Sequence, residues 1–122
     1  MSYFQSHEKL EVYHYSLSFT VLADKVSNSL PRGRAYLVDQ LRRAATSIPL
    51  NIAEGAGEFS PSEKCRFYRM AKRSATECSS ILDVMRSLQL VEEKHFVEAM
   101  EALCRIVAML ITMIKRIGDK AH

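Results

Sequence analysis

The sequence is poor in several residue types that would mark particular functions. It contains no Trp and only 8% aromatic residues, so it lacks an aromatic platform on which single-stranded nucleic acid would stack. Its three cysteines, Cys65, Cys78 and Cys104, include no CxxC pair. An odd number of widely spaced cysteines fits reduced thiols in a protein core better than a disulfide framework or a zinc site.

Long hydrophobic runs are also missing. The most apolar stretch, residues 103–114, is interrupted by Arg105 and followed by Lys115. A membrane-spanning helix needs about 20 uncharged residues, so this stretch predicts a buried helix instead. The first nine residues contain no apolar core of a secretory signal. We therefore expect a cytoplasmic protein with no membrane contact.

The overall composition is that of an ordinary globular domain. Of the 122 residues, 48% are hydrophobic and 25% are charged, which predicts one domain spanning residues 1–122. Seventeen Lys and Arg face fourteen Asp and Glu, a net charge of +3. This surplus permits an anionic partner without demanding one.

The few Gly and Pro residues divide the chain into helical segments. Breaks fall at Pro31–Gly33 and at Gly55–Pro61, and apolar residues between the breaks recur at helical spacing. The sequence Ser60-Pro61-Ser62-Glu63 is a capping box with proline at the first helical position. We predict an all-α protein with helices at about 7–30, 36–55, 61–88 and 92–117. Short loops should join them into an antiparallel up-down four-helix bundle.

Two details of these helices carry further expectations. Pro49 should kink the second helix, because it gives no donor to the backbone ladder. The first and fourth helices carry more apolar residues than one bundle core requires, including Leu17 and Val21 in the first and Met109 and Ile111 in the fourth. Burial against another subunit is the simpler explanation, so we expect a homo-oligomer. A very broad core face is the alternative.

Polar residues form one stripe on the second helix and a shorter one on the third. They recur at spacings of three and four, which places each set on one helix face. The cluster consists of Gln40, Arg43, Ser47, Asn51, Glu54, Ser74 and Glu77. In an antiparallel hairpin, Arg43 and Asn51 should meet Glu77 and Ser74 as a structural clamp between helices or subunits. A ligand pocket and a solvated surface are the alternatives.

The segment Gln40–Gly55, which contains most of this polar cluster, carries a family resemblance. Together with the cap at Ser60 and the run Arg66–Asp83, it resembles the four-helix bundle protein family, also described as the proteins encoded in intervening sequences of bacterial large-subunit ribosomal RNA genes. The resemblance covers about Lys9–Ile117. The close matches are Gln40-Leu41-Arg42-Arg43-Ala44, Ser47-Ile48, Asn51-Ile52-Ala53-Glu54-Gly55, Phe67, Ser74 and Glu77. One departure lies at the third turn, where the family usually has Gly-Tyr and this chain has Gln89-Leu90.

The resemblance implies a cytosolic bundle that assembles into a closed ring, a pentamer. A related branch, the accessory proteins of diversity-generating retroelements, forms such rings and binds reverse transcriptase and nucleic acid through a basic surface. The family at large has no assigned biochemical activity. Its label as a ribosomal protein reflects the location of the gene.

A basic cluster is the strongest functional lead in the sequence. Five cations occur in ten residues of the third helix with no acid between them, and one more precedes them on the second helix. The cluster is Arg42, Lys64, Arg66, Arg69, Lys72 and Arg73. Such a patch, repeated around a ring, would bind RNA or DNA phosphates in a salt-sensitive, sequence-independent way. A solvated helix face with internal ion pairs is the alternative.

Catalytic groups are sparse. His7 and His14 lie two turns apart, too far along one helix to share a metal, and Gly55-Ala56-Gly57 follows a helix rather than a strand, so it is no dinucleotide fingerprint. We predict a non-enzymatic oligomeric protein without metal or cofactor that binds nucleic acid, or a nucleic-acid enzyme, through its basic face. The alternative is a structural or adaptor ring whose partner is another protein.

Overall fold

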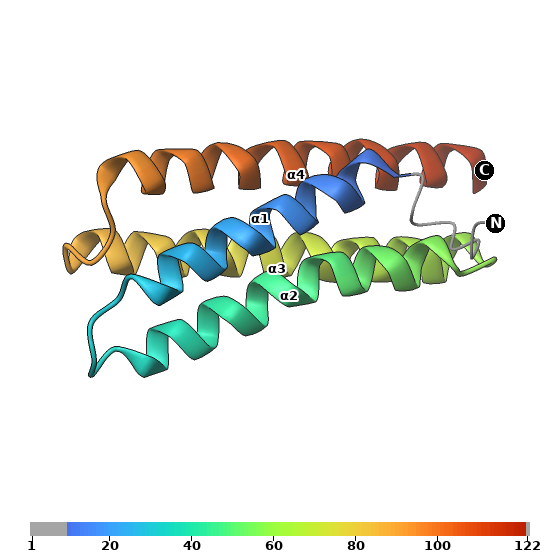
Figure 1. Ribbon diagram of the computed structural model, residues 1–122. Coiled ribbons are helices and arrows are strands. Elements are labelled where there is room, and N and C mark those ends of the chain that lie inside the picture. Colours follow the sequence, from blue (N-terminus) through green and yellow to red (C-terminus); the bar gives the residue numbers. More distant parts are fainter. Residues whose placement is uncertain (1–9, 122) are drawn as a thin grey trace, which may run out of the picture.

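The protein forms a bundle of long helices joined by short loops. The computed structural model describes residues 10–121, with side chains to Asp119. It contains α1 (Glu11–Asn28), α2 (Ala35–Ala56), α3 (Pro61–Ser87) and α4 (Glu93–Ala121), and these residues form no strand. Successive helices run in opposite directions in Figure 1. The predicted all-α four-helix fold is confirmed.

The ends of the first and fourth helices differ from the prediction. Residues 7–9 lie outside the described part of the chain, and Leu10 is extended, so α1 begins at Glu11. It ends at Asn28 rather than at residue 30, because the residue before Pro31 is disfavoured in the helical region. The other difference is that α4 continues past Gly118 to Ala121 instead of ending at residue 117. One glycine costs a helix only about 1 kcal/mol, and Ile117 still packs against the core there.

The turn after α3 explains a break that contains neither Gly nor Pro. Gln89 adopts a left-handed backbone with φ 59°. The Leu90 amide donates to the Met85 carbonyl at 2.8 Å, and the Gln89 amide donates to the Arg86 carbonyl at 2.9 Å. These two bonds form a Schellman motif, which normally has glycine at the left-handed position. The chain therefore ends α3 with a glycine-type cap that carries a glutamine side chain.

We expect Gln89→Gly to stabilise the protein. Relief of the left-handed strain should exceed the entropy that glycine adds to the unfolded chain, with a net gain of about 0.5 kcal/mol. Urea denaturation followed by circular dichroism measures this change. A loss of stability would contradict the cap geometry.

The core is closed by a ring of helix contacts, in which α1 and α3 each pack against α2 and α4. Its largest fully buried side chains include Phe19, Leu41, Ile48, Leu82 and Ile106. The apolar residues of α1 form two stripes, and the stripe through Val12, Phe19 and Val26 is buried. The other stripe is left exposed, at Leu17 and Val21, as the expected surplus requires.

The junction between α2 and α3 shows the Ser60 half of the predicted capping box, while the Glu63 carboxylate pairs with Arg66. Ser60 accepts the Glu63 amide at 3.4 Å, and Pro61 occupies the first helical position. Before the turn, α2 continues unbroken through the buried Pro49 to Ala56. The kink expected at Pro49 stays a prediction. No helix built from the described residues is long and apolar enough to cross a membrane.

Candidate functional site

Half of the predicted basic cluster is engaged in internal contacts. The Arg42 Nε lies 3.2 Å from Asp24, and its guanidinium also donates to Asn28 at 2.6 Å. The second, Lys64, donates through Nζ to the Gly55 and Ala56 carbonyls, at 3.0 and 3.1 Å. It thereby caps the C-terminus of α2, where unpaired carbonyls favour a cation.

The third internally engaged cation is Arg66. Its Nε lies 2.8 Å from Glu63, and its guanidinium lies over the Phe67 ring at 4.4 Å. Arg42, Lys64 and Arg66 therefore have partners within the chain and are poor candidates for binding an external anion.

The other half of the cluster gathers at one groove between α3 and α4. Arg69, Lys72 and Arg73 line its α3 side, and Lys115 lines its α4 side. The groove has a volume of about 460 Å³ and is completed by Ile111 and Ile114. We call this set of lining residues the basic groove.

The charge of the basic groove is uncompensated. No acidic residue lines it, and none of its four cations forms an ion pair with a carboxylate of the described residues. Four like charges around one concavity raise the local concentration of anions. The groove is therefore suited to bind phosphate or carboxylate groups. Sequence reasoning missed Lys115, because only the packing of α4 against α3 brings it beside Arg69 and Arg73.

Three members of the predicted polar cluster meet between α2 and α3. The Ser74 hydroxyl lies 2.9 Å from the Ser47 hydroxyl and donates to it. Asn51 donates through Nδ2 to the same hydroxyl and to the Ser47 carbonyl, both at 2.9 Å. These three half-buried residues form a small polar clamp between the two helices.

The remaining members of that cluster do not join the clamp. They are all exposed: Gln40, Arg43, Glu54 and Glu77. The expected pairing of Arg43 with Glu77 within the helix hairpin is wrong, because no such ion pair forms. The α2–α3 contact is instead built on small buried residues such as Ala44 and Ala71, and this leaves no room for long charged side chains between the helices.

Ser74→Ala and Arg43→Ala separate the clamp from the exposed stripe. We expect Ser74→Ala to lower the free energy of unfolding by about 1 kcal/mol, because Ser47 loses a partner. Arg43→Ala should change it by less than about 0.5 kcal/mol. Urea midpoints measure both. A larger loss for Arg43→Ala than for Ser74→Ala would support the charged clamp and contradict this prediction.

Comparison with known proteins places this fold and its motifs in a family. The sequence model of the 23S rRNA-intervening sequence protein family matches residues 8–112. The chain belongs to this family. The resemblance carried by Gln40–Gly55 is thus confirmed.

Among solved structures, the chain is similar to a protein of unknown function from the S23 ribosomal protein family of Bacteroides thetaiotaomicron VPI-5482. The TM-score is 0.80 at 23% sequence identity, covering 85% of this chain and 98% of that one. At this identity the likeness shows the shared fold. No curated protein matches the chain.

Metal-ligating residues of this family member are dispersed. Over residues 10–119, no three or more His, Cys, Asp or Glu side chains gather where they would hold a metal ion. One Glu-x-x-His spacing does occur, from Glu92 to His95 at the start of α4. Bundle metal sites need such a motif on two helices together with further carboxylates.

The cysteines differ in accessibility. Cys65 and Cys78 are buried and Cys104 is exposed, and all three are free thiols. Burial, and secondarily the Glu77 carboxylate, raises the pKa of the Cys78 thiol to about 12. Burial also raises the pKa of Tyr68, with a smaller contribution from Cys65.

These environments predict selective thiol chemistry. At pH 8 we expect a thiol reagent to modify Cys104 quickly and Cys78 only after unfolding, because the thiolate is the reactive form. Loss of the fast phase in Cys104→Ser is the control, and a fast phase of more than one thiol per chain would contradict this prediction. The folded chain also keeps the Cys78 proton up to a pKa of about 12, whereas the unfolded chain releases it near the ordinary thiol pKa of 9.0. The free energy of unfolding should therefore fall as pH rises from 9 toward 12.

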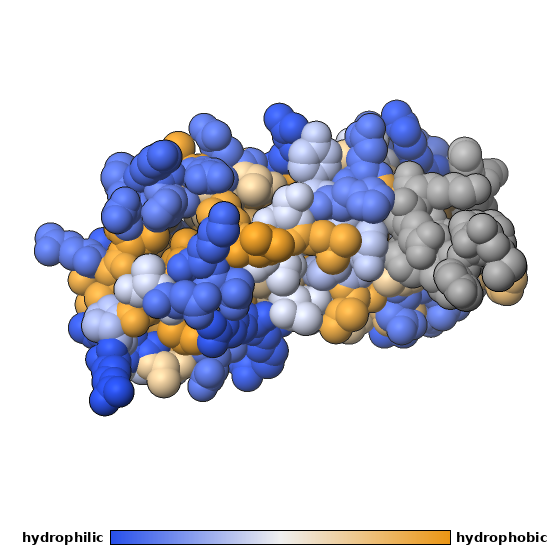
Figure 2. Space-filling model, viewed as in Figure 1, coloured by the Kyte–Doolittle hydropathy of each residue, from blue (hydrophilic) through white to orange (hydrophobic). Residues whose placement is uncertain are grey.

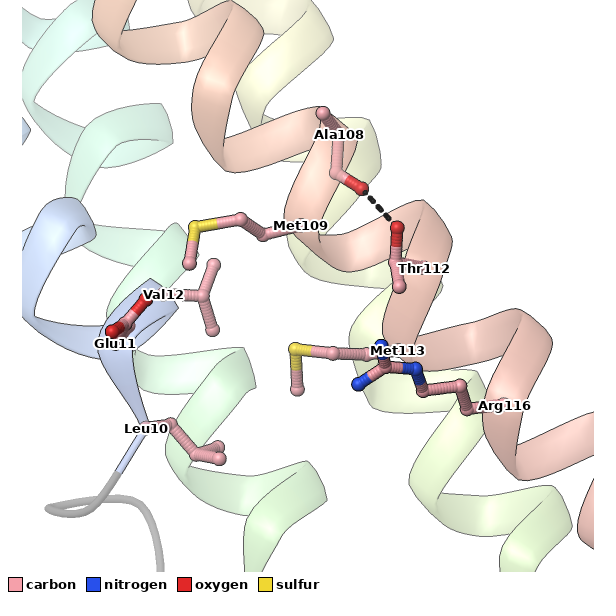
Figure 3. A pocket seen from close by; sticks show the side chains of 8 residues that line it. All are labelled: Leu10, Glu11, Val12, Ala108, Met109, Thr112, Met113 and Arg116. Atoms are coloured by element: carbon pink, nitrogen blue, oxygen red, sulfur yellow. Dashed lines mark hydrogen bonds between the residues drawn. The ribbon is translucent and has the colours of Figure 1, made fainter.

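A second pocket lies where α4 extends beyond the start of α1. Its volume is about 310 Å³ (Figure 3). Met109 and Met113 of α4 and Val12 of α1 point toward one another in it, while Glu11 and Arg116 stand among the lining residues. The one hydroxyl in the lining, that of Thr112, donates to the Ala108 carbonyl of its own helix rather than to a base that would activate it.

Proposed function

We propose that this family member is a non-catalytic, self-associating binding module whose basic groove binds the phosphate backbone of RNA or DNA. The observation that carries the proposal is a set of four cations that line one groove in which no acidic residue takes part: Arg69, Lys72, Arg73 and Lys115. A cytoplasmic location is part of the proposal, supported by three free cysteines, since disulfides are rare in that compartment.

Binding of this kind is electrostatic and independent of sequence. Lys and Arg that neutralise phosphates release counterions, so affinity falls as salt rises. Four contacts predict a slope of log K against log salt between about −2.8 on single strands and −3.6 on duplexes. A single groove would bind weakly, and several grooves on one assembly would raise the avidity.

Fluorescence anisotropy of labelled RNA and DNA of about 20 nucleotides, titrated across salt concentrations, tests this function. We expect binding of both nucleic acids at low salt, with little dependence on sequence and the slopes given above. Flat, negligible binding at low salt would overturn the proposal.

The self-association is supported by exposed apolar residues on the α1–α2 side. Val21 of α1 and Thr46 of α2 line one groove of about 330 Å³. Leu17 lies one turn before Val21 on α1, and Leu50 lies one turn after Thr46 on α2. Their exposed fractions are 39% and 60%. The face seen in Figure 2 carries apolar patches among polar ones. Burial of such residues against another copy is the simplest way to remove them from water.

Light scattering after gel filtration tests the assembly. The family resemblance implies a closed ring of five chains, so we expect a mass about five times the 13.9 kDa of one chain. Val21→Glu with Leu50→Glu should dissociate it while the helical circular dichroism stays intact. A monomer mass for the unaltered protein would refute self-association.

The second candidate function is an adaptor whose partner is another protein. An apolar groove next to the basic one favours this function, because the charged phosphates of a nucleic acid do not bind to an apolar surface. This groove is lined by Ala75 and Ser79 of α3 and by Met100, Cys104 and Val107 of α4, among others. Salt-insensitive binding of a protein would distinguish this function from the first.

A further inference from the structure

A second apolar seam runs along α4 beside the one that faces the core. Its members follow one another at spacings of three and four, the heptad rhythm of a helix that packs against another helix. The seam consists of Val97, Met100, Cys104, Val107, Ile111 and Ile114. Val97 and Ile111 are 43% and 49% exposed, whereas the core row is buried. The seam is thus only partly used by this chain.

The seam borders a groove of about 320 Å³ between α3 and α4. On the α3 side the groove is lined by Ala75, Thr76 and Ser79, whose small side chains allow a backbone to approach closely. The Thr76 and Ser79 hydroxyls donate to carbonyls of their own helix, at 3.1 and 2.7 Å. These two hydroxyls therefore need no hydrogen-bond partner from a ligand in the groove. We call this apolar groove, together with the basic groove beside it, the α3–α4 channel.

Charge marks one end of this channel. Ile111 lines both the apolar groove and the basic groove, so the two grooves adjoin at this side chain. At the shared end stand Arg69, Lys72, Arg73 and Lys115, with no acidic residue among the lining. An occupant that fits the whole channel is apolar along most of its length and negatively charged at one end.

We propose that the α3–α4 channel docks an amphipathic helix of another protein. The helix carries apolar residues at positions i, i+3 or i+4, and i+7, and acidic residues at the end that lies among the four cations. Helices bind apolar grooves through anchors at this spacing. The seam from Val97 to Ile114 is about 26 Å long, enough for almost five turns of such a helix.

The exposed α1 stripe of a second copy would cover this channel only in part. The exposed apolar stripe of α1, Leu17 and Val21, spans one turn and fills only a fraction of the seam. The proposal shares the four cations, Ile111 and Ile114 with the basic groove, but the rest of its apolar seam lies outside that groove: Val97, Met100, Cys104 and Val107. The two can therefore fail separately.

Selection from a display library tests the proposal on the full chain. The probe is a library of helical peptides of about 18 residues, with apolar anchors at heptad spacing and all other positions varied among Glu, Lys, Ser and Gln. No nucleic acid is present, so failure of RNA binding does not affect the result. We expect selected peptides to be enriched in Glu at one end and in neutral residues elsewhere.

Two matched variants locate the binding site. Ile111→Glu places a charge in the seam and should weaken the selected peptides at least about tenfold. Val84→Glu makes the same change at a residue that is 45% exposed on α3 and lines neither groove, and it should weaken them less than about twofold. Circular dichroism confirms that both variants are folded.

Three results would overturn the proposal. The first is a selection without binders or without enrichment of Glu at one end. The second is binding that survives Ile111→Glu. The third is a decrease in the mass of the assembled protein caused by Ile111→Glu, which would assign the seam to a second copy of the chain.

Discussion

Gly55→Ala is expected to lower the free energy of unfolding by about 1–3 kcal/mol, the usual cost of forcing a methyl group into a packed site. A Cβ at this position would lie 2.7 and 2.9 Å from two atoms of the Tyr68 ring and 3.1 Å from the Phe67 Cβ. Tyr68 is only 3% exposed, so its ring has little room to move. The contact holds the end of α2 against the start of α3, and its loss loosens both. Urea denaturation measures the change.

Gly57→Ala is the matched control, two residues further along. There a Cβ would meet only the Ala53 and Glu54 carbonyls, both at the ordinary distance of 3.7 Å. Its φ of −82° suits any residue. We expect no loss, or a gain of up to about 1 kcal/mol from the smaller entropy of the unfolded chain. Equal losses for both variants would show that the close approach at Gly55 does not control stability.

The second large effect concerns the basic groove. We expect the double variant Arg69→Ala with Arg73→Ala to weaken RNA binding about 10- to 100-fold at moderate salt. The slope of log K against log salt should become less steep by the amount that two phosphate contacts contribute. Both arginines line the groove and neither has an internal ion pair within the described residues. Anisotropy titrations at several salt concentrations provide both numbers.

The control removes the same charge from the internally paired arginines. Arg42 is held by Asp24 and Arg66 by Glu63. The double variant Arg42→Ala with Arg66→Ala should therefore weaken RNA binding less than about threefold, because it reduces only the long-range electrostatic attraction. If the two double variants weaken binding equally, net charge rather than the groove governs the interaction.

Local signals made most of the fold predictable. Glycine and proline breaks placed two of the three loops between helices, and the capping box at Ser60 predicted the first residue of α3 correctly. The end of α3 was harder to predict, because Gln89 adopts a conformation that usually needs glycine. Gly118 predicted an end of α4 that the structure does not have, since packing of the last turns outweighs its low helix propensity.

The candidate site was less predictable, because its composition depends on contacts between helices. Spacing showed that Arg69 and Arg73 share a face, but it gave no sign that Lys115 would join them. Arg42 looked equally available in the sequence, yet Asp24, eighteen positions away, pairs with it. The Arg43–Glu77 prediction failed for the same reason, because a helix face is defined locally while its neighbour is defined by packing.

The most direct test of the central claim is a lysine footprint of the RNA complex. An amine-acylating reagent, read out by mass spectrometry, reports the accessibility of Lys72 and Lys115 with and without RNA. We expect RNA to reduce labelling of these two groove lysines severalfold, while Lys25 and Lys94, which line neither groove, react as before. Unchanged labelling of Lys72 and Lys115 with RNA bound, or equal protection of all four lysines, would contradict the assignment of the basic groove as the binding surface.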